Sequence, residues 1–331
     1  MNSARLTFPA LTATLKAAAE ATRLRLLMLI AEAELTVTDL TAILRQSQPR
    51  LSRHLRLLAE AGLVERHREG SWAFFRLGEA GSAADIARAL IARLDPNDPI
   101  IARDREQLAA VRAARAAAAQ SYFRRHAAEW DRIRRLHVAD AAVEDAIRAA
   151  LGDQPLRSLL DLGTGTGRML ELFADDIERG LGLDLSLDML ALARARLDRA
   201  GLKHCTVRYG DIYDLALARD SFDVVIIHQV LHFLDDSARA IREAARVLRP
   251  GGRLVVVDFA PHDLEFLRDE HAHRRLGFAA ETVTQWLEAV GLDIVRQETL
   301  PPGPEGKIAV SLWLARDPRL LVAAPATREV A

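Results

Sequence analysis

A glycine-rich segment, DLGTGTG, lies between an apolar run and a helical pattern at residues 161–167. Glycine lets the backbone approach a ligand closely and take positive φ angles without a Cβ clash. Dinucleotide-binding proteins carry similar loops, but the spacing here is GxGxG rather than GxGxxG, and Asp161 precedes the first glycine. The segment predicts a cofactor loop. A tight strand-to-helix turn in another α/β fold is the alternative.

Two further acids follow the next two apolar runs, where they could bind parts of a nucleoside. Asp184 ends the run GLGLD, and a carboxylate there can accept hydrogen bonds from both hydroxyl groups of a ribose. Asp211, in VRYGDIYDL, is placed to bind the amino group of an adenine. The loop and these acids together predict a site for an adenosine-containing cofactor.

A second chemical feature lies near the amino terminus, where a helical pattern separates apolar from cationic side chains. Leu51, Leu55 and Leu58 recur at positions i, i+4 and i+7, and therefore share one face. Arg53 lies nearly opposite, flanked by Arg50, Ser52 and Arg56. Guanidinium and hydroxyl groups on such a face can reach guanine edges or phosphates in a DNA major groove. A solvated arginine face on an ordinary helical domain is the alternative.

The next segment predicts a β-hairpin that would lie beside this helix. The two strands are expected at 63–67 and 72–77, with a tight turn at Glu69 and Gly70. Arg66 and Arg68 would share a face of the first strand near the hairpin tip. Residues 45–76 hold seven arginines against three glutamates, a balance that favours a phosphate partner.

The elements that position the DNA-reading helix are short helices. Residues 8–34 predict two helices, and the capping side chains in Thr36 to Asp39 precede a third at 39–44. Ser47 or Gln48 begins the fourth, with Pro49 in its first turn, and Gly62 ends it. Further helices are expected at 82–94, 103–136 and 139–151. The segment 103–136 is too polar on several faces for a core helix and predicts a linker or dimer helix.

The elements that position the glycine loop alternate between strands and helices. A βαβ pattern of this kind predicts a parallel sheet with helices on its faces. The last two strands have no helix between them and predict an antiparallel edge pair. The expected strands are 157–162, 181–185, 204–208, 223–228, 253–258, 292–299 and 307–315.

The segment Glu34 to Leu77, ELTVTDLTAILRQSQPRLSRHLRLLAEAGLVERHREGSWAFFRL, resembles the ArsR/SmtB family of winged-helix repressors over roughly residues 10–95. The resemblance implies an α+β winged-helix domain, a homodimer, a palindromic operator in double-stranded DNA, and an effector that releases it. The residues expected at the DNA by this resemblance and by the hairpin pattern are Gln48, Arg50, Ser52, Arg53, His54, Arg66 and Arg68.

The chain departs from the metal-sensing members of that family. Those members carry a Cys-Val-Cys segment before the third helix, where this chain has Thr36-Val37-Thr38. Threonine cannot supply the thiolates that arsenite and soft metals require. His126, Glu129, His137 and Asp140 are an alternative set of ligands on a helical stretch, but solvated side chains are the simpler interpretation. No metal is expected.

The glycine loop and the acids, with FDVVIIHQVLHFL and VLRPGGRLVVVDF, resemble class I S-adenosylmethionine-dependent methyltransferases over residues 155–315. The resemblance implies a Rossmann-like α/β domain with a seven-stranded sheet. It also implies S-adenosylmethionine, or S-adenosylhomocysteine as an effector. The segment from Tyr122 to Arg134 resembles the helix that often covers this pocket. The implied cofactor contacts are Asp161, Gly163, Thr164, Gly165, Gly167, Asp184, Leu185, Asp211, Ile212 and His228.

The catalytic residues and the methyl acceptor are not identified by the sequence. His228 and His232 are the candidates for a base, with packing and hydrogen bonding as the alternative role of His232. Residues 271–278, HAHRRLGF, predict either a site for an anionic substrate or signal, or a polar surface helix. A small-molecule acceptor is favoured. HQVL replaces the Pro-Pro-aromatic motif of adenine-N6 enzymes, and Cys205 is the single cysteine, whereas arsenic methyltransferases use several.

The composition shows a charge difference between the two halves of the chain and predicts where in the cell the protein is found. Residues 1–150 hold 23 basic against 18 acidic residues, and residues 151–331 hold 22 against 28. A positive front half suits DNA. One cysteine, no signal-peptide pattern at the start and no apolar run of about 18 residues predict a cytoplasmic protein with no membrane partner. The expected domains are 1–95 for DNA binding and dimerisation, 96–150 as linker and lid, 151–316 for the methyltransferase, and 317–331 as a flexible tail.

Three functions fit these expectations. The first is a transcriptional regulator, expected to be a repressor, whose second domain binds S-adenosylmethionine or S-adenosylhomocysteine and retains methyltransferase activity. The second is a small-molecule methyltransferase whose winged helix serves as a dimer or autoregulatory module. The third is a metal-responsive repressor, which Thr36 and Thr38 oppose.

Overall fold

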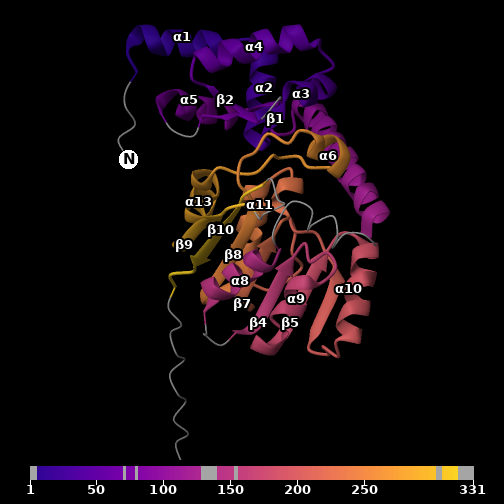
Figure 1. Ribbon diagram of the computed structural model, residues 1–331. Helices are drawn as coiled ribbons and strands as arrows, with labels where there is room; N and C mark the ends of the chain where they lie inside the picture. The colour runs from indigo at the N-terminus through magenta and orange to yellow at the C-terminus, as the bar shows by residue number, and fades with distance from the viewer. Residues whose placement is uncertain are drawn as a thin grey trace, which may run out of the picture. The chain divides into compact units, whose positions relative to one another are not determined.

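The computed structural model describes residues 6–69, 72–78, 81–127, 140–152, 156–302 and 308–319. The chain divides into two compact units, residues 1–119 and residues 120–331 (Figure 1). The division falls inside one helix, whereas the sequence led us to expect a separate linker over 96–150. Each unit has a hydrophobic core of its own.

The first unit is a helical domain that carries a small antiparallel sheet in the order β1-β3-β2. Its core is formed by apolar side chains from the helices and the sheet, among them Leu26, Leu40, Leu55 and Phe75. These elements match the winged-helix pattern that the sequence predicts. They are α1 (Phe8–Ala18), α2 (Ala21–Glu32), β1 (Leu35–Thr36), α3 (Val37–Leu44), α4 (Gln48–Glu60), β2 (Val64–Glu69), β3 (Trp72–Leu77), α5 (Ser82–Ile91) and α6 (Pro99–His126).

Helix α3 begins at a side-chain cap, and helix α4 begins beside a proline without one. The Thr36 hydroxyl accepts a hydrogen bond from the Asp39 N–H at 3.2 Å, and the Asp39 carboxylate accepts one from the Thr36 N–H at 2.9 Å. This capping box starts α3 two residues earlier than the sequence predicted. Helix α4 follows Ser47, with Pro49 in its first turn, and Leu51 is fully buried on its inner face.

Helix α6 packs against the first unit along one face. Ile101 and Leu108 are buried in its core, and Arg25 donates both guanidinium arms to the buried Asp104 carboxylate at 2.6 Å. Arg115 also pairs with Asp39, the residue that caps α3. The sequence suggested a linker helix too polar for a core. Instead its polar residues on this face are paired with charges of the domain. The predicted extension to Leu136 lies beyond the residues that are described.

The second unit is a three-layer α/β domain built on a seven-stranded sheet in the order β6-β5-β4-β7-β8-β10-β9. Strands β4 to β8 are parallel, and β10 runs antiparallel between β8 and β9. This confirms the predicted Rossmann-like sheet with its antiparallel edge pair. The strands are β4 (Leu156–Leu162), β5 (Ile177–Asp184), β6 (Cys205–Tyr209), β7 (Phe222–His228), β8 (Leu248–Phe259), β9 (Asp293–Leu300) and β10 (Val310–Arg316).

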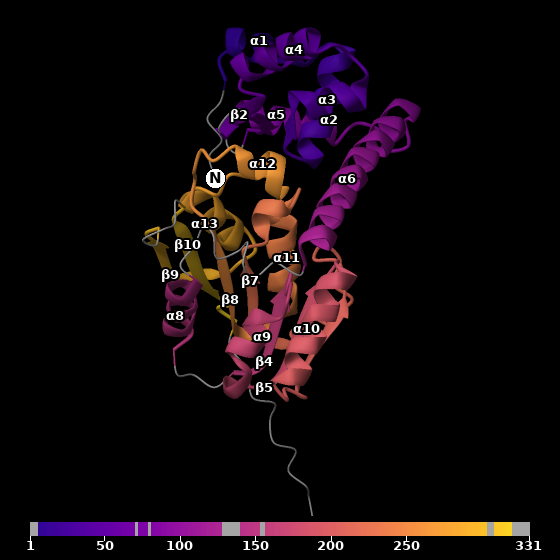
Figure 2. The same cartoon turned by 45° about the vertical axis from the view of Figure 1, so that its right-hand side comes forward.

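Helices cover both faces of this sheet (Figure 2). One face packs against α8 (Asp140–Leu151), α9 (Arg168–Leu172) and α10 (Leu187–Arg199), and the other against α11 (Ser237–Val247) and α13 (Ala280–Ala289). Because strand order reverses between β4 and β7, the loops after these strands separate at their carboxyl ends. Ligands of open α/β sheets bind at such a point.

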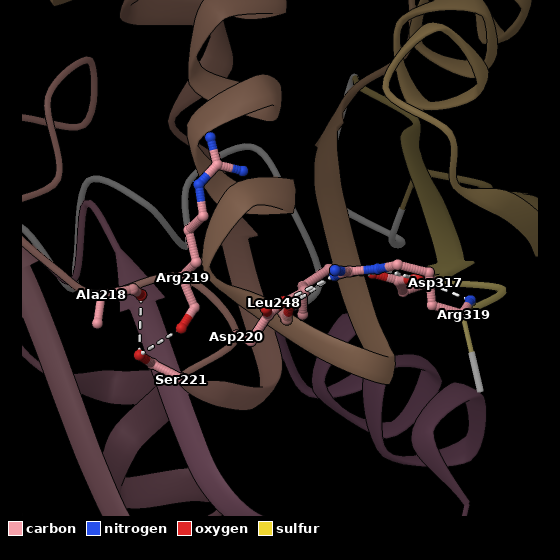
Figure 3. A network of polar contacts seen from close by, with 7 residues as sticks. All are labelled: Ala218, Arg219, Asp220, Ser221, Leu248, Asp317 and Arg319. Atoms are coloured by element: carbon pink, nitrogen blue, oxygen red, sulfur yellow. Dashed lines mark hydrogen bonds and ion pairs between the residues drawn. The ribbon is translucent and has the colours of Figure 1, made fainter. Parts of the chain in front are cut away.

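Polar contacts connect the strand ends on the side of the sheet where β7 and β8 begin (Figure 3). The Arg319 guanidinium donates to the Asp220 carboxylate at 2.8 Å and to the Leu248 carbonyl at 3.2 Å, and it pairs with Asp317. These contacts tie the chain after β10 to the beginnings of β7 and β8. Residues 317–319, which we expected in a flexible tail, are thus joined to the sheet, and 320–331 lie outside the described residues.

Within the described part of the chain, no helix combines the length and the apolar character that crossing a bilayer requires.

Candidate cofactor and DNA-contact sites

The glycine loop follows β4 and is fixed to the neighbouring strand by its backbone. The N–H groups of Gly163 and Thr164 both donate to the Leu183 carbonyl, at 2.8 and 3.0 Å. Gly163 and Gly165 have φ angles of 71° and 52°, in the region that favours glycine. A Cβ on Gly163 would lie 2.5 Å from a methyl group of Val230, so no other residue fits there without movement. The loop therefore presents bare backbone at the carboxyl edge of β4.

The Asp161 side chain stabilises this loop through a hydrogen bond to Thr164. The side chain is buried, and it accepts a hydrogen bond from the Thr164 hydroxyl at 2.6 Å. The family resemblance implied that Asp161 is one of the cofactor contacts. The structure shows in addition that this hydrogen bond joins the first part of the loop, at Asp161, to Thr164, so the two predicted residues fix each other's position.

Asp184 connects the loop to the end of β5. Its carboxylate accepts hydrogen bonds from the Gly165 N–H and from the Ser186 N–H, each at 2.8 Å. Burial raises the pKa of Asp184, while these donors and the Leu185 N–H lower it. The donors thus hold one carboxylate orientation. A fixed carboxylate at this strand end is suited to accept hydrogen bonds from ribose hydroxyl groups.

The end of β6 is joined to the same place. The Gly210 N–H donates to the Asp184 carbonyl at 3.1 Å, which brings the following residues to the edge of the loop. The Asp211 carboxylate accepts from the Tyr213 N–H at 2.9 Å, and Ile212 is buried beside it. His228 ends β7, on the other side of β4, and is half-buried. The predicted cofactor residues thus end the neighbouring strands β4, β5, β6 and β7.

The donor set at this edge fits an adenosyl group. Backbone N–H and carboxylate groups are the partners that sugar hydroxyls and an adenine amino group require. The loop glycines Gly163, Gly165 and Gly167 have positive φ and leave room where side chains would otherwise stand.

His232 is held in the core beside this edge by a residue that the sequence analysis missed. Its Nδ1 lies 2.8 Å from the Asp258 carboxylate, and both side chains are almost fully buried. Its ring packs against Phe233, Phe259 and His273, with centroids 4.0 to 4.7 Å apart. These contacts give His232 a packing and hydrogen-bonding role. The signal for Asp258 was its position as the one charged residue in the apolar run LVVVDF.

The segment 271–278 is not a polar surface helix, which was one of its two interpretations. Helix α12 (Phe266–His271) ends at His271, and His273, Arg274 and Arg275 are buried beyond it. Arg274 pairs with Asp235 at 2.6 Å, and the N–H groups of Arg274 and Arg275 donate to the His232 carbonyl. The side chains that looked solvated in the sequence therefore pack against the ends of β7 and β8.

The last turn of α6 belongs to the second unit. The Tyr122 hydroxyl lies 2.6 Å from His271 Nδ1, and Phe123 packs edge-on against Phe233 at 4.9 Å. Burial raises the pKa of Tyr122 to about 12, so its hydroxyl keeps its proton at neutral pH. This turn is the beginning of the predicted pocket-covering segment 122–134, of which residues 128–134 lie outside the described residues.

The exposed face of α4 carries most of the residues expected at DNA. Gln48, Arg50, Ser52 and Arg53 are exposed on this helix, as is Arg66 on β2. His54 differs from them, because its side chain is 14% exposed and its Nδ1 lies 3.6 Å from the Glu20 carboxylate. It therefore faces α2 and the core rather than the open surface. The side chain of Arg68 lies outside the described residues.

The alternative metal ligands are not brought together by the described structure. Within the described part of the chain, no group of three or more histidine, cysteine, aspartate or glutamate side chains is placed to hold a metal ion. Glu129 and His137 lie outside it. Thr36, at the position of a metal-sensing cysteine, caps α3.

Comparison with known families finds two matches in this chain. The model of the bacterial regulatory proteins of the arsR family matches residues 20–66. The model of a methyltransferase domain matches residues 160–256. The first covers α2 to β2, and the second covers the glycine loop, the three acids and most of β8.

Individual relatives match the second unit in part. A probable S-adenosylmethionine-dependent methyltransferase of Mycolicibacterium smegmatis is 36% identical over 143 residues, which are 42% of this chain and 52% of that protein. An arsenite methyltransferase of Aquipseudomonas alcaligenes is 37% identical over 128 residues, 36% of this chain and 34% of that protein. The N-methyltransferase NodS of Bradyrhizobium japonicum, solved with S-adenosyl-L-homocysteine, has a TM-score of 0.44 and 24% identity over 52% of this chain and 84% of that one.

This chain spans about a third to just over a half of the curated relatives it matches. S-adenosylmethionine is the cofactor of the matched domain class, and the arsR match indicates DNA binding. The chain therefore combines an arsR-family helix-turn-helix region with a class I S-adenosylmethionine-dependent methyltransferase domain.

Proposed function

We propose that this protein is a transcriptional repressor whose methyltransferase domain binds S-adenosylmethionine or S-adenosylhomocysteine and retains methyltransferase activity. The observation that carries the proposal is the placement of α6. Within the first unit it is locked to the DNA-binding core by Asp104 and Arg25, and its last turn packs beside His271 in the second unit. A helix that contributes residues to both units would give ligand occupancy a physical route to the DNA-binding domain.

The DNA-binding part of the proposal rests on the exposed face of α4. Arg50 and Arg53 are exposed there while Leu51 and Leu55 are buried, so the helix is fixed by its apolar side and free on its cationic side. Arginine reads guanine or binds phosphate from such a face. We propose that Gln48, Ser52 and Arg53 contact DNA, with Arg50 and the wing residues Arg66 and Arg68 beside them.

The cofactor part of the proposal rests on the edge formed by β4, β5 and β6. We propose that Gly163 and Gly165 pass beneath the cofactor, that Asp184 binds the ribose and that Asp211 and Ile212 bind the adenine. When bound, the cofactor would supply an electrophilic methyl group. The protein would mainly hold the acceptor in line with it, since alignment is the main requirement of this transfer.

A second candidate function is small-molecule methylation with the winged helix as an accessory. The intact glycine loop and acids favour a working enzyme. Arsenite is a poor candidate acceptor, although one relative is an arsenite methyltransferase. The single cysteine, Cys205, is buried in the sheet, and burial raises its thiol pKa, so little thiolate forms.

The experiment that tests the proposed function is the affinity of the full-length protein for its own upstream DNA at fixed salt. It compares no ligand, S-adenosylmethionine and S-adenosylhomocysteine. We expect at least a fivefold change in the dissociation constant with one ligand and a smaller change with the other, because allosteric coupling is typically about 1–3 kcal/mol. Tight DNA binding that neither ligand alters would reject ligand-controlled repression and favour the second candidate.

The contact between Tyr122 and His271 gives a prediction about this coupling. Tyr122→Phe removes one partly buried hydrogen bond, worth about 0.5–1.5 kcal/mol, and keeps the ring. We expect the ligand-induced change in DNA affinity to fall by about threefold or more, with ligand affinity itself unchanged within about twofold. Tyr209→Phe, at an exposed tyrosine of β6, is the matched control and should keep the full ligand response.

Helix α1 supports the proposal that the protein is a homodimer on a palindromic operator. Phe8, Leu11 and Leu15 are exposed at 83%, 37% and 44% and recur at helical spacing, which leaves an apolar stripe open. Leu15→Glu should weaken self-association at least tenfold by placing a charge in this stripe. Sedimentation equilibrium measures it, with Leu192→Glu on α10 as control. A variant that stays dimeric at the same concentration would exclude α1 from the interface.

A further inference from the structure

Two buried hydrogen-bond donors lie at the carboxyl ends of the neighbouring strands β7 and β8. The first is Gln229, which follows β7 with a φ angle of 56° and is 6% exposed. Its backbone N–H donates to the Val257 carbonyl at 2.7 Å, which fixes the residue beside β8. Its side-chain Nε2 is buried and has no hydrogen-bond partner among the residues that the structure describes.

The second donor is His262, in the segment after β8. The Leu264 N–H donates to its Nδ1 at 3.3 Å, and this contact leaves the proton of a neutral imidazole on Nε2. That Nε2 is also buried without a partner in the described part of the chain. The His262 N–H donates to the Leu276 carbonyl at 3.0 Å, so the backbone is held in place.

The surroundings of His262 keep its imidazole neutral. Burial, followed by the nearby His232 and Arg268, lowers its pKa to about 4, against the smaller opposing effects of Asp263 and Asp258. At neutral pH the ring is therefore an uncharged N–H donor. Phe259 lies edge-on to it at 6.0 Å and itself stacks on His273, so buried aromatic rings pack beside the donor.

Buried donors without partners are rare, because each costs about 1–3 kcal/mol of stability. Gln229 and His262 lie after the carboxyl ends of β7 and β8, the two strands that follow β4 in the sheet order. Open α/β sheets bind their ligands at the carboxyl ends of their strands. We propose that Gln229 and His262 bind the methyl acceptor, and that this acceptor is a small aromatic compound bearing a carbonyl or carboxylate oxygen. This inference rests on the proposed methyltransferase function.

The chemistry of the two unpartnered atoms disfavours an amine as the methyl acceptor. Each Nε2 offers an N–H, which pairs with an oxygen lone pair and cannot pair with the N–H of an ammonium group. An amine acceptor is therefore disfavoured at this site, whereas a compound with acceptor oxygens can pair with these donors.

The test is binding of three probes of similar shape to the full-length protein, with and without saturating S-adenosylhomocysteine, by ligand-observed NMR titration. Acetophenone and benzoate present only acceptor oxygens, and benzylamine presents an ammonium group. We expect saturable binding of the first two and at least tenfold weaker binding of benzylamine. Equal binding of all three, or binding of none, would overturn the proposal.

Variants locate the binding on the two donors. Gln229→Asn, which tolerates positive φ, and His262→Phe should each weaken acetophenone and benzoate binding by about tenfold. Gln297→Asn on β9 and His204→Phe before β6 are matched exposed controls and should bind the probes normally. Probe affinities that the Gln229 and His262 variants leave unchanged would also overturn the proposal.

Affinity for S-adenosylhomocysteine is measured calorimetrically on every protein in this series. It should be retained in all variants, which shows that they are folded. Its absence in the unmodified protein would reject the proposed function itself. Failure of the proposed function is therefore distinguishable from failure of the acceptor proposal. The first appears as absent S-adenosylhomocysteine binding, and the second as a missing probe preference or as probe binding that does not depend on Gln229 and His262.

Discussion

Asp184→Asn should lower the affinity for S-adenosylhomocysteine by about tenfold to a hundredfold. The carboxylate accepts one hydrogen bond from Gly165 and one from Ser186, and its remaining lone pairs are the proposed ribose contacts. Asparagine turns one acceptor into a donor that faces an N–H group. Hydrogen bonds to charged groups are worth about 1.5–3 kcal/mol each, which corresponds to this loss of affinity.

Isothermal titration of the variant and the unmodified protein measures the effect. Asp198→Asn, on the exposed end of α10, is the matched control and should bind like the unmodified protein. Since the first unit is unchanged, the Asp184 variant should still bind DNA in the absence of ligand. An unaltered affinity for S-adenosylhomocysteine would place the cofactor away from the end of β5.

Arg53→Ala should weaken operator binding by about tenfold to a hundredfold, without changing affinity for S-adenosylhomocysteine. A bidentate contact of arginine to guanine is worth about 1–3 kcal/mol, and a homodimer would be affected at both half-sites. The substitution leaves the core intact, because Arg53 is exposed while Leu51 and Leu55 carry the packing of α4.

The role of Arg53 follows from two measurements of this variant. If it binds phosphate, the slope of log affinity against log salt should decrease by about one for each phosphate that is no longer neutralised. If it reads a base, discrimination between operator and unrelated DNA should fall instead. Arg103→Ala, on an exposed position of α6, is the control. Wild-type affinity in the Arg53 variant would move the DNA interface off the exposed face of α4.

Local patterns predicted the elements of this fold well. Strand β3 has the predicted bounds, and the glycine loop lies between β4 and α9 as expected. These features are fixed by residues close in sequence. The Thr36 capping box, for example, uses residues three positions apart. The same holds for the apolar stripe of Leu51, Leu55 and Leu58, whose spacing alone identifies the buried face of α4.

The features that the sequence analysis missed depend on partners far apart in the chain. Asp104 is buried on a polar-looking helix because Arg25, 79 positions earlier, neutralises it. His232, which follows β7, is hydrogen-bonded to Asp258 near the end of β8. Arg274 can be buried because its guanidinium forms an ion pair with the Asp235 carboxylate. Hydrophobic periodicity assigns a charged residue to the surface, so it cannot detect a pair of opposite charges that become buried together.

The packing of α6 also limits how this protein can be divided into fragments. A fragment that stops at residue 95 would lack Ile101, Leu108 and Asp104, and Arg25 would be left without its carboxylate. The smallest autonomous DNA-binding fragment should therefore extend to about residue 119. For the same reason, an engineered fusion that exchanges the downstream domain should keep α6 to about residue 119 with the DNA-binding unit.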